Sequence, residues 1–370
     1  MEKKEKIAFA AINPVLVDNI VSPAEKTSKA SKWVIWGDGN AYPNYLYSLY
    51  QDVPTLHSLV DGLVDYILGD GVTSNVVQMT DYQARKLARS VARSIVIYGG
   101  AAVNVLRSKS GQVAKACPLD MRCVRSTKDG SLVFYSEYFR DKKTYMTKYE
   151  TLEFLPFSKE SDVATSIFLY KNTEFQTYPS PMYGGAVTAC ELERKINEYF
   201  INAINNNFSA NVIINLNNGQ PTEEQQEEIE RNFSEKFAGV ENAGAFVLSF
   251  NDDKEHSTTI EQIKQDDWSE RFKSLRDRAR QEIYTAFRAN PNLFGLATEN
   301  LGFSSEEYES SFKLFSRTVV LPLQQQVCEV IDTIFGEGSI TIEPFTIDFV
   351  GNKQDVEEVE TNEVKVEDNE

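Results

Sequence analysis

The amino-acid sequence predicts a mixed α+β fold in which two long helices flank a small α/β insertion. Three observations predict it. Apolar residues recur at helical spacing in several long segments, and a stretch near residues 94–170 is rich in Val, Ile, Tyr and Phe and broken by Gly-containing turns. A strand–helix–strand pattern also lies between two helical segments at residues 210–257. The chain has 370 residues, 41% of them hydrophobic and 25% charged, which is typical of a folded protein with room for two or three domains.

The first large unit is predicted at residues 33–185, after an N-terminal arm at residues 1–32. Residues 55–68 carry apolar side chains three and four positions apart, the spacing of a buried helix face. The residues of this face are Leu56, Leu59, Val60, Leu63, Val64 and Ile67. We therefore expect this helix to lie in the core, with His57 outside its apolar stripe.

The rest of this unit is predicted to be one further helix followed by strands. Residues 81–93 have helical spacing, and residues 94–170 have the composition of strands. Asp129-Gly130 stands between two such runs, and this dipeptide favours the tight turn of a β-hairpin. The unit as a whole is expected to be an α+β domain.

Two helices are predicted on either side of the insertion, at residues 186–209 and 258–290. Their apolar stripes are expected to face inward and include Leu192, Tyr199 and Leu275. Inside the insertion, Thr222-x-x-Gln225 is a capping box that opens an acidic helix. This helix exposes a charged face to solvent or to a partner, and its charged residues include Glu223, Glu224, Glu227, Glu228 and Arg231.

The C-terminal part begins with a loop and a long helix. Residues 291–303 contain one proline and two glycines, which suit a mobile loop. A helix and short strands follow at residues 304–350, and Pro322 is predicted to kink the helix because proline has no backbone N–H. Residues 351–370 hold eight acidic and two basic groups without an aromatic, so this tail is predicted to be disordered.

The inventory of reactive groups offers no catalytic residue, metal site or cofactor site. The chain has two distant histidines, four cysteines without a Cys-x-x-Cys, no phosphate-binding loop and no Gly-x-Ser-x-Gly. The cysteines are expected to be buried or half-buried free thiols. The net charge is −17, from 38 basic and 55 acidic residues, which argues against a protein that coats nucleic acid. No apolar run is long enough to span a membrane, so a membrane is not expected as a partner.

At this point the ordered series of motifs resembles the portal, or head–tail connector, proteins of tailed bacteriophages, in the branch with long non-contractile tails. The segments that carry the resemblance are Asn40-Ala41-Tyr42-Pro43, Gly69-Asp70-Gly71-Val72, Cys117-Pro118-Leu119-Asp120, Ser180-Pro181-Met182-Tyr183-Gly184, Asn242-Ala243-Gly244, Leu293-Phe294-Gly295 and Val320-Leu321-Pro322. It covers residues 33–350. The short C-terminal portion departs from the family pattern.

The resemblance implies an architecture and a role. Residues 33–185 would be the wing, the two flanking helices the stem, residues 210–257 the clip and residues 291–303 the tunnel loop. Family members form a twelve-subunit ring at one capsid vertex, through which double-stranded DNA enters and leaves. The implied partners are further copies of the chain, the terminase large subunit, a head–tail adaptor and the major capsid protein or scaffold. The implied location is the virion, after assembly in the bacterial host cytoplasm.

The resemblance also gives roles to single residues. The residues expected to line the DNA channel at the tunnel loop are Arg288, Asn292, Leu293, Phe294 and Asn300. The basic residues of the second stem helix are Arg271, Lys273, Arg276, Arg278 and Arg280. We expect these to form salt bridges with a neighbouring subunit or to contact phosphate. The acidic clip helix is expected to be either a solvated face or the surface on which the motor or adaptor docks.

Two other functions remain open from the sequence. One is another ring-forming virion adaptor with the same topology but without a tunnel loop. The other is a metal-dependent phosphodiesterase that uses acidic pairs such as Asp252-Asp253 and Asp266-Asp267. No loop spacing supports metal binding at these pairs, so solvated charge is the favoured interpretation.

Overall fold

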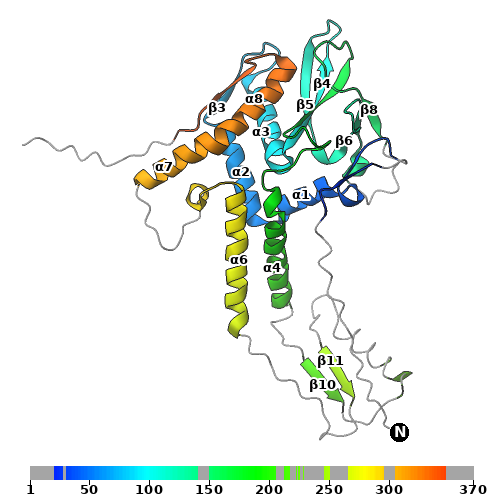
Figure 1. Cartoon of the computed structure of the whole chain (residues 1–370), viewed down its shortest axis with the longest axis vertical. Helices are drawn as coiled ribbons and strands as arrows, with labels where there is room; N and C mark the ends of the chain where they lie inside the picture. The colour runs from blue at the N-terminus through cyan, green and yellow to red at the C-terminus, as the bar shows by residue number, and fades with distance from the viewer. Residues whose placement is uncertain are drawn as a thin grey trace, which may run out of the picture.

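Two antiparallel helices project like a stalk from a mixed helix-and-strand body (Figure 1). The computed structural model describes residues 21–27, 31–140, 150–205, 212–216, 222, 224–225, 228, 246–250, 266–295 and 305–346. The two stalk helices are α4 (Val187–Asn205) and α6 (Asp266–Ala286). Helix α4 leaves the body and α6 returns to it, and the described strands between them lie beyond the far end of the stalk (Figure 1).

The body holds the other described helices and most of the strands. Its helices are α1 (Tyr42–Asp52), α2 (Pro54–Leu68), α3 (Asp81–Tyr98), α7 (Ser305–Phe315) and α8 (Leu321–Phe335). Its strands are β1 (Glu25–Lys26), β2 (Ile35–Trp36), β3 (Gly71–Ser74), β4 (Gly100–Arg107), β5 (Val113–Leu119), β6 (Val124–Ser126), β7 (Val133–Tyr135), β8 (Leu152–Phe154), β9 (Thr165–Lys171) and β12 (Ile340–Glu343).

Helix α2 lies at the centre of the body. The six apolar residues predicted for its inner face are all fully buried, and the helix contacts α1, α3, α6 and α8. Full burial of each such side chain stabilises the fold by about 1.5–3 kcal/mol. His57 keeps 44% of its side chain exposed and lies outside this stripe, as expected.

The boundary predicted between the third helix and the strands is wrong. The helix α3 continues past Arg93 to Tyr98, and Gly99 ends it in a left-handed conformation with φ 81°. The last four helical residues are all buried apolar ones, Ile95, Val96, Ile97 and Tyr98. A run that is apolar on every side has no helical period, so it has the same pattern as a buried strand.

Two three-stranded antiparallel sheets form the outer part of the body. In the first, β4 lies between β5 and β9; in the second, β7 lies between β6 and β8. The hairpin predicted at Asp129-Gly130 is confirmed, because β6 and β7 pair antiparallel on either side of it and Gly130 has φ 71°. In the first sheet β9 pairs along its length only with β4 among the described strands, so β9 is an edge strand.

The C-terminal part closes the body on its other side. Strand β12 pairs antiparallel with β3, which extends the core next to α3 and α8. The predicted long helix is present as α7 and α8, joined by a π-helical segment at Ser316–Val320. Pro322 lies in the first turn of α8, so the distortion expected at the proline occurs in the wider π turn just before it. The strand residues predicted at 347–350 lie outside the described residues.

The insertion beyond the stalk contains a parallel pair, β10 (Val212–Leu216) and β11 (Phe246–Phe250). Both strands were predicted. Parallel strands need a crossover connection, which fits the predicted strand–helix–strand order. At the start of this connection the backbone N–H of Thr222 donates to Gln225 Oε1 over 3.1 Å, one half of the predicted capping box.

Gly69 is expected to tolerate no side chain. It ends α2 with φ 58°, and a Cβ placed on it would lie 1.8 Å from the carbonyl oxygen of Glu343. We expect Gly69→Ala to lower the free energy of unfolding by about 2–4 kcal/mol. The control is Gly130→Ala, where φ is 71° but no atom lies within 4 Å of the added carbon, so only the conformational cost of about 1 kcal/mol remains. Urea unfolding of both variants measures the difference, and equal losses would contradict the steric explanation.

Candidate functional site

The stalk and the turn at its base form the candidate site, and a buried carboxylate anchors one side of it. Glu191 on α4 is only 2% exposed. Its Oε2 accepts hydrogen bonds from the hydroxyl of Tyr45 on α1 over 3.3 Å and from Arg194 Nη2 over 2.6 Å. A buried carboxylate is stable only where such donors surround it, so this contact ties α4 to α1.

A second buried carboxylate anchors the other side of α4. Glu193 is 1% exposed, and its Oε1 accepts from Thr55 Oγ1 on α2 over 2.8 Å and from Arg280 Nε on α6 over 3.4 Å. One side chain thereby joins both stalk helices to the body. The sequence analysis did not identify either glutamate, although the order Cys190-Glu191-Leu192-Glu193 within a mostly apolar helix start was a usable signal.

The basic residues of α6 have partners that the sequence analysis did not expect. Arg280 pairs with Glu193, and Arg276 donates to Asn197 Oδ1 over 3.2 Å, with its guanidinium 5.2 Å from the centre of the Phe200 ring. Both groups therefore contact α4 of the same chain, and Arg280 supplies the cation that the buried glutamate requires nearby. The expected role of these residues toward a neighbouring subunit or phosphate stays a prediction.

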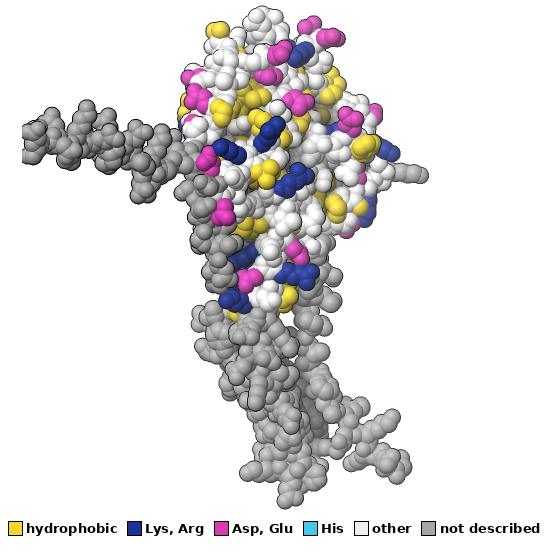
Figure 2. All heavy atoms as spheres, turned by 60° about the vertical axis from the view of Figure 1, so that its left-hand side comes forward, with side chains coloured by type: hydrophobic (Ala, Val, Ile, Leu, Met, Phe, Trp, Pro, Cys, Tyr) yellow, Lys and Arg dark blue, Asp and Glu magenta, His cyan; other side chains and the backbone are white. Residues whose placement is uncertain are grey.

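The other basic residues of α6 are solvent-facing or lie outside the described side chains. Arg278 is 75% exposed and pairs with Glu282 over 2.9 Å, one helical turn away. Lys273 is also exposed, and the side chain of Arg271 is outside the described part. Figure 2 shows basic and acidic side chains side by side along the stalk. Such exposed pairs contribute little to stability, so these residues remain available for contacts outside the chain.

Some apolar residues of the stalk are less buried than predicted. Leu192, Tyr199 and Leu275 are 36%, 47% and 42% exposed, although all three were expected to face inward. Tyr199 still stacks on Phe272 at 4.7 Å between ring centres. The physical reason is that two helices bury only the narrow stripe between them, while the apolar stripe on these helices is wider. The stalk therefore carries apolar surface that the single chain does not cover.

The segment predicted as the start of a mobile tunnel loop is instead part of the body. Residues Pro291–Phe294 form a 3₁₀ turn, which Asn290 caps by accepting from the Asn292 N–H over 3.2 Å. Leu293 is 6% exposed and its carbonyl accepts from the Tyr66 hydroxyl over 2.8 Å. The Leu293 side chain is therefore buried in the body, and its role at the channel stays a prediction.

Phe294 is likewise directed into the body. Its ring lies 5.7 Å from the rings of Tyr66 and Phe315 and 6.3 Å from that of Tyr284. Apolar contact with α2, α6 and α7 explains why this part does not form a free loop. Asn292 is half-buried, and its Nδ2 has no hydrogen-bond partner among the described residues. Asn300 lies outside them.

Arg288 remains as an exposed cation at the base of the stalk. It follows α6 with φ 52°, a left-handed conformation that a residue with a side chain rarely adopts. Two hydrogen bonds hold this turn, from Arg288 N–H to the Thr285 carbonyl and from Ala289 N–H to the Tyr284 carbonyl, both 3.0 Å. The turn thereby keeps Arg288 in a strained backbone conformation with its side chain exposed.

The acidic face of the insertion is described only in part. Glu224 and Glu228 are helical and exposed, as the sequence predicted. Glu223, Glu227 and Arg231 lie outside the described residues. The exposed face keeps its interpretation as either a solvated or a docking surface.

The described residues do not assemble a metal or nucleophile site. No group of three or more His, Cys, Asp or Glu side chains suited to a metal ion occurs among them. Burial raises the pKa of the Cys123 thiol to about 11 and that of Cys190 to about 12, so neither is a thiolate near neutral pH. All four cysteines are free and buried or half-buried, which confirms the prediction. No helix within the described ranges has both the length and the apolar composition to cross a membrane.

Comparison with known proteins identifies the family. Residues 78–352, well over half of the chain, match the family model described as phage portal protein. A curated relative, the probable portal protein of Haemophilus phage HP1 (strain HP1c1), is 25% identical over 246 residues, which cover 66% of this chain and 67% of the relative. The chain therefore belongs to the phage portal protein family, as the sequence predicted. The branch with long non-contractile tails stays a prediction.

The chain also aligns with solved structures. A chain in the neck of a native gene transfer agent particle, computed with C12 symmetry, aligns with a TM-score of 0.50 at 16% identity, covering 83% of this chain and 85% of that one. An HK97-family phage portal protein from Corynebacterium diphtheriae aligns with a TM-score of 0.43 at 11% identity over 80% of this chain and 94% of its own. The first of these supports the α+β fold.

Removal of the cation beside Glu193 is expected to destabilise the stalk base. Arg280→Met leaves a buried carboxylate without its positive partner, and because Arg280 is itself 41% exposed we expect a loss of about 2 kcal/mol in the free energy of unfolding. Arg278→Met is the matched control on the same helix, with a loss of about 0.5 kcal/mol or less because its pair is exposed. Urea unfolding compares the two, and equal effects would contradict the anchoring role of Glu193.

Proposed function

We propose that the chain forms a closed ring at one capsid vertex, the conduit through which double-stranded DNA is packaged and ejected. Family membership supports this function, and the structural observation that carries it is the partly exposed apolar surface of the stalk. Copies placed side by side would cover Leu192 on α4 and Leu275 on α6, which a single copy leaves in contact with water. When one face of a copy contacts a different face of the next copy, the copies close into a ring if a whole number of equal rotations completes a full turn.

Twelve copies are the proposed number. The gene transfer agent neck with which this chain shares its fold was computed with C12 symmetry. The domain roles follow from the same likeness. Residues 33–185 and 304–350 would form the wing around the ring, α4 and α6 the stem, and residues 210–257 the clip that docks the terminase large subunit and later the head–tail adaptors. The wing would contact the major capsid protein or scaffold.

The charge of the chain suits a conduit. A duplex slides only where the wall does not bind its phosphates tightly, and a net charge of −17 disfavours such binding. Within the stalk Arg276 donates to Asn197 and Arg280 to Glu193, which leaves fewer of their N–H groups free for phosphate. The function is structural and includes no catalytic step.

Arg288 is the residue we propose for direct contact with DNA. Its guanidinium is exposed at the base of the stalk, next to the 3₁₀ turn that leads into residues 296–303. A left-handed conformation costs a non-glycine residue about 1 kcal/mol or more. Glycine would avoid that cost, so a useful side chain at this position is a reason for the strain to be kept.

The ring is tested by mass and by imaging. Twelve copies of a 41.9 kDa chain make a particle of roughly 500 kDa. We expect purified protein to show rings with a central hole in negative-stain electron microscopy and this mass in light scattering. A monomer at all salt concentrations that cuts DNA in the presence of magnesium would overturn the proposal in favour of a phosphodiesterase.

Substitution of Arg288 should separate stability from function. We expect Arg288→Gly to raise the free energy of unfolding by about 1 kcal/mol because it relieves the left-handed strain. Arg288→Ala should leave it nearly unchanged, since alanine is strained in the same way. Both variants should form rings but package less DNA, as measured by nuclease-protected DNA in particles. Normal packaging by both would show that Arg288 does not contact the duplex.

A further inference from the structure

The outer edge of strand β9 has unused backbone hydrogen-bonding groups. Along β9 the even-numbered residues face β4, as shown by the bonds from Asn172 N–H to the Gly99 carbonyl and from Arg107 N–H to the Ala164 carbonyl. The odd-numbered residues therefore direct their N–H and C=O groups outward. Ile167 uses its outward groups, because its N–H donates to the Leu155 carbonyl and its carbonyl accepts from Phe157 N–H.

The next two odd residues are not paired in this way. The backbone N–H and C=O groups of Leu169 and Lys171 have no partner among the residues that the structure describes. An open strand edge of this kind accepts an added strand, in which main-chain hydrogen bonds supply affinity and side-chain pockets supply specificity.

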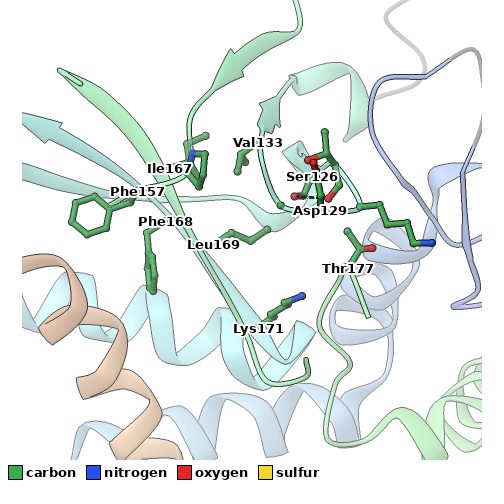
Figure 3. A pocket seen from close by; sticks show the side chains of 13 residues that line it. Ser126, Asp129, Val133, Phe157, Ile167, Phe168, Leu169, Lys171 and Thr177 are labelled. Carbon is green, nitrogen blue, oxygen red and sulfur yellow. Dashed lines mark hydrogen bonds between the residues drawn. The ribbon is translucent and has the colours of Figure 1, made fainter. Parts of the chain in front are cut away.

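A hollow of about 250 Å³ adjoins this free edge (Figure 3). On one side Leu169 and Lys171 project into it from β9, and on the other lies the turn that carries Ser126 and Asp129. Its apolar lining is Val133, Pro156, Phe157, Ile167, Phe168 and Leu169. The hollow has room for a large apolar side chain of an added strand.

The N-terminal arm reaches the body beside this hollow. The Glu25 carboxylate accepts from the backbone N–H groups of Thr177 and Tyr178 over 3.1 and 2.7 Å, and Thr177 lines the hollow. Twenty residues precede Val21, the first described residue. Nine Cα steps separate Ile12 from Val21 and span up to roughly 30 Å when extended. The arm can therefore return to the β9 edge of its own chain.

The arm also contains a segment of suitable composition. Residues 7–12 read Ile-Ala-Phe-Ala-Ala-Ile, an uncharged apolar run that Asn13-Pro14 ends. Ile7, Phe9 and Ala11 fall on one face of such a strand and the remaining three on the other. In water this run would expose apolar surface, and burial on the hollow removes it.

We propose that residues 7–12 add to the body of their own chain as a further strand along the free half of β9. The backbone of this strand pairs with Leu169 and Lys171, and Phe9 fills the hollow between β9 and the turn at Ser126–Gly130. The arm is thereby a structural part of the wing sheet. This assignment does not depend on the ring or on DNA passage.

Amide hydrogen exchange on the full-length protein, resolved at single residues, tests the proposal. We expect the N–H groups of Leu169 and Lys171 to exchange slowly, and at least tenfold faster in Ile7→Asp/Phe9→Asp, which places two charges in the apolar strand. The N–H groups of Phe168 and Tyr170 are an internal control, because they face β4 and should not change. Val15→Asp/Val17→Asp is the matched control, with the same added charge in the arm outside the proposed strand.

Three results would overturn the assignment. The first is fast exchange at Leu169 and Lys171 in the unaltered chain, which shows an unoccupied edge. The second is slow exchange that Ile7→Asp/Phe9→Asp does not affect, which shows another occupant such as the acidic residues 351–370. The third is protection that disappears when the protein is diluted to monomers, which shows that the strand comes from a second copy.

Discussion

Two buried carboxylates on α4 fix where the stalk stands. A helix pair held at only one end needs directional contacts at its base, because apolar packing alone lets helices shift along one another. Glu191 and Glu193 supply them toward α1 on one side and toward α2 and α6 on the other. Each costs several kcal/mol when buried without partners, so the surrounding hydroxyl and guanidinium groups must all be in place at once. The hydrogen bonds of Glu191 and Glu193 thereby hold the base of the stalk against the body.

An aromatic cluster also holds the base of the stalk, through the turn that follows α6. Phe294, just after the stalk, and Phe315, at the end of α7, both pack on Tyr66 of α2 with ring centres 5.7 and 5.8 Å away. The cluster thus holds the turn after α6 and the C-terminal end of α7 against the same helix. Substitutions that loosen this cluster would move that turn together with the base of the stalk.

The sequence predicted the elements whose burial follows a simple period. The face of α2, the β6–β7 hairpin and the two strands of the insertion belong to this group, because local sequence patterns decide them. The end of α3 at Tyr98 was missed because its last turn is apolar all round. Leu293 and Phe294 were assigned to a loop because proline and glycine mark turns, whereas burial of a turn depends on contacts far along the chain.

The candidate site was less predictable because its contacts also join residues that are far apart in the sequence. The sequence shows that Arg276 and Arg280 lie on one side of a helix, but not that Asn197 and the buried Glu193 lie opposite. The role of a charged helix residue depends on the group it contacts. Arg276 and Arg280 contact groups 79 and 87 positions away in the sequence, so local spacing does not predict them. Arg288 differs from Arg276 and Arg280, because the DNA contact proposed for it depends on its exposure and on its position after the last turn of α6.

These assignments together limit how the channel wall can hold DNA. A guanidinium that already donates to a group of its own chain has fewer N–H groups free for phosphate, and an exposed cation next to an acidic side chain binds phosphate weakly. On α6 the first condition applies to Arg276 and Arg280, and the second to Arg278 beside Glu282. In the proposed ring, a channel wall built from such helices would present few free positive charges. Weak and localised attraction is what a duplex needs to be guided without being held.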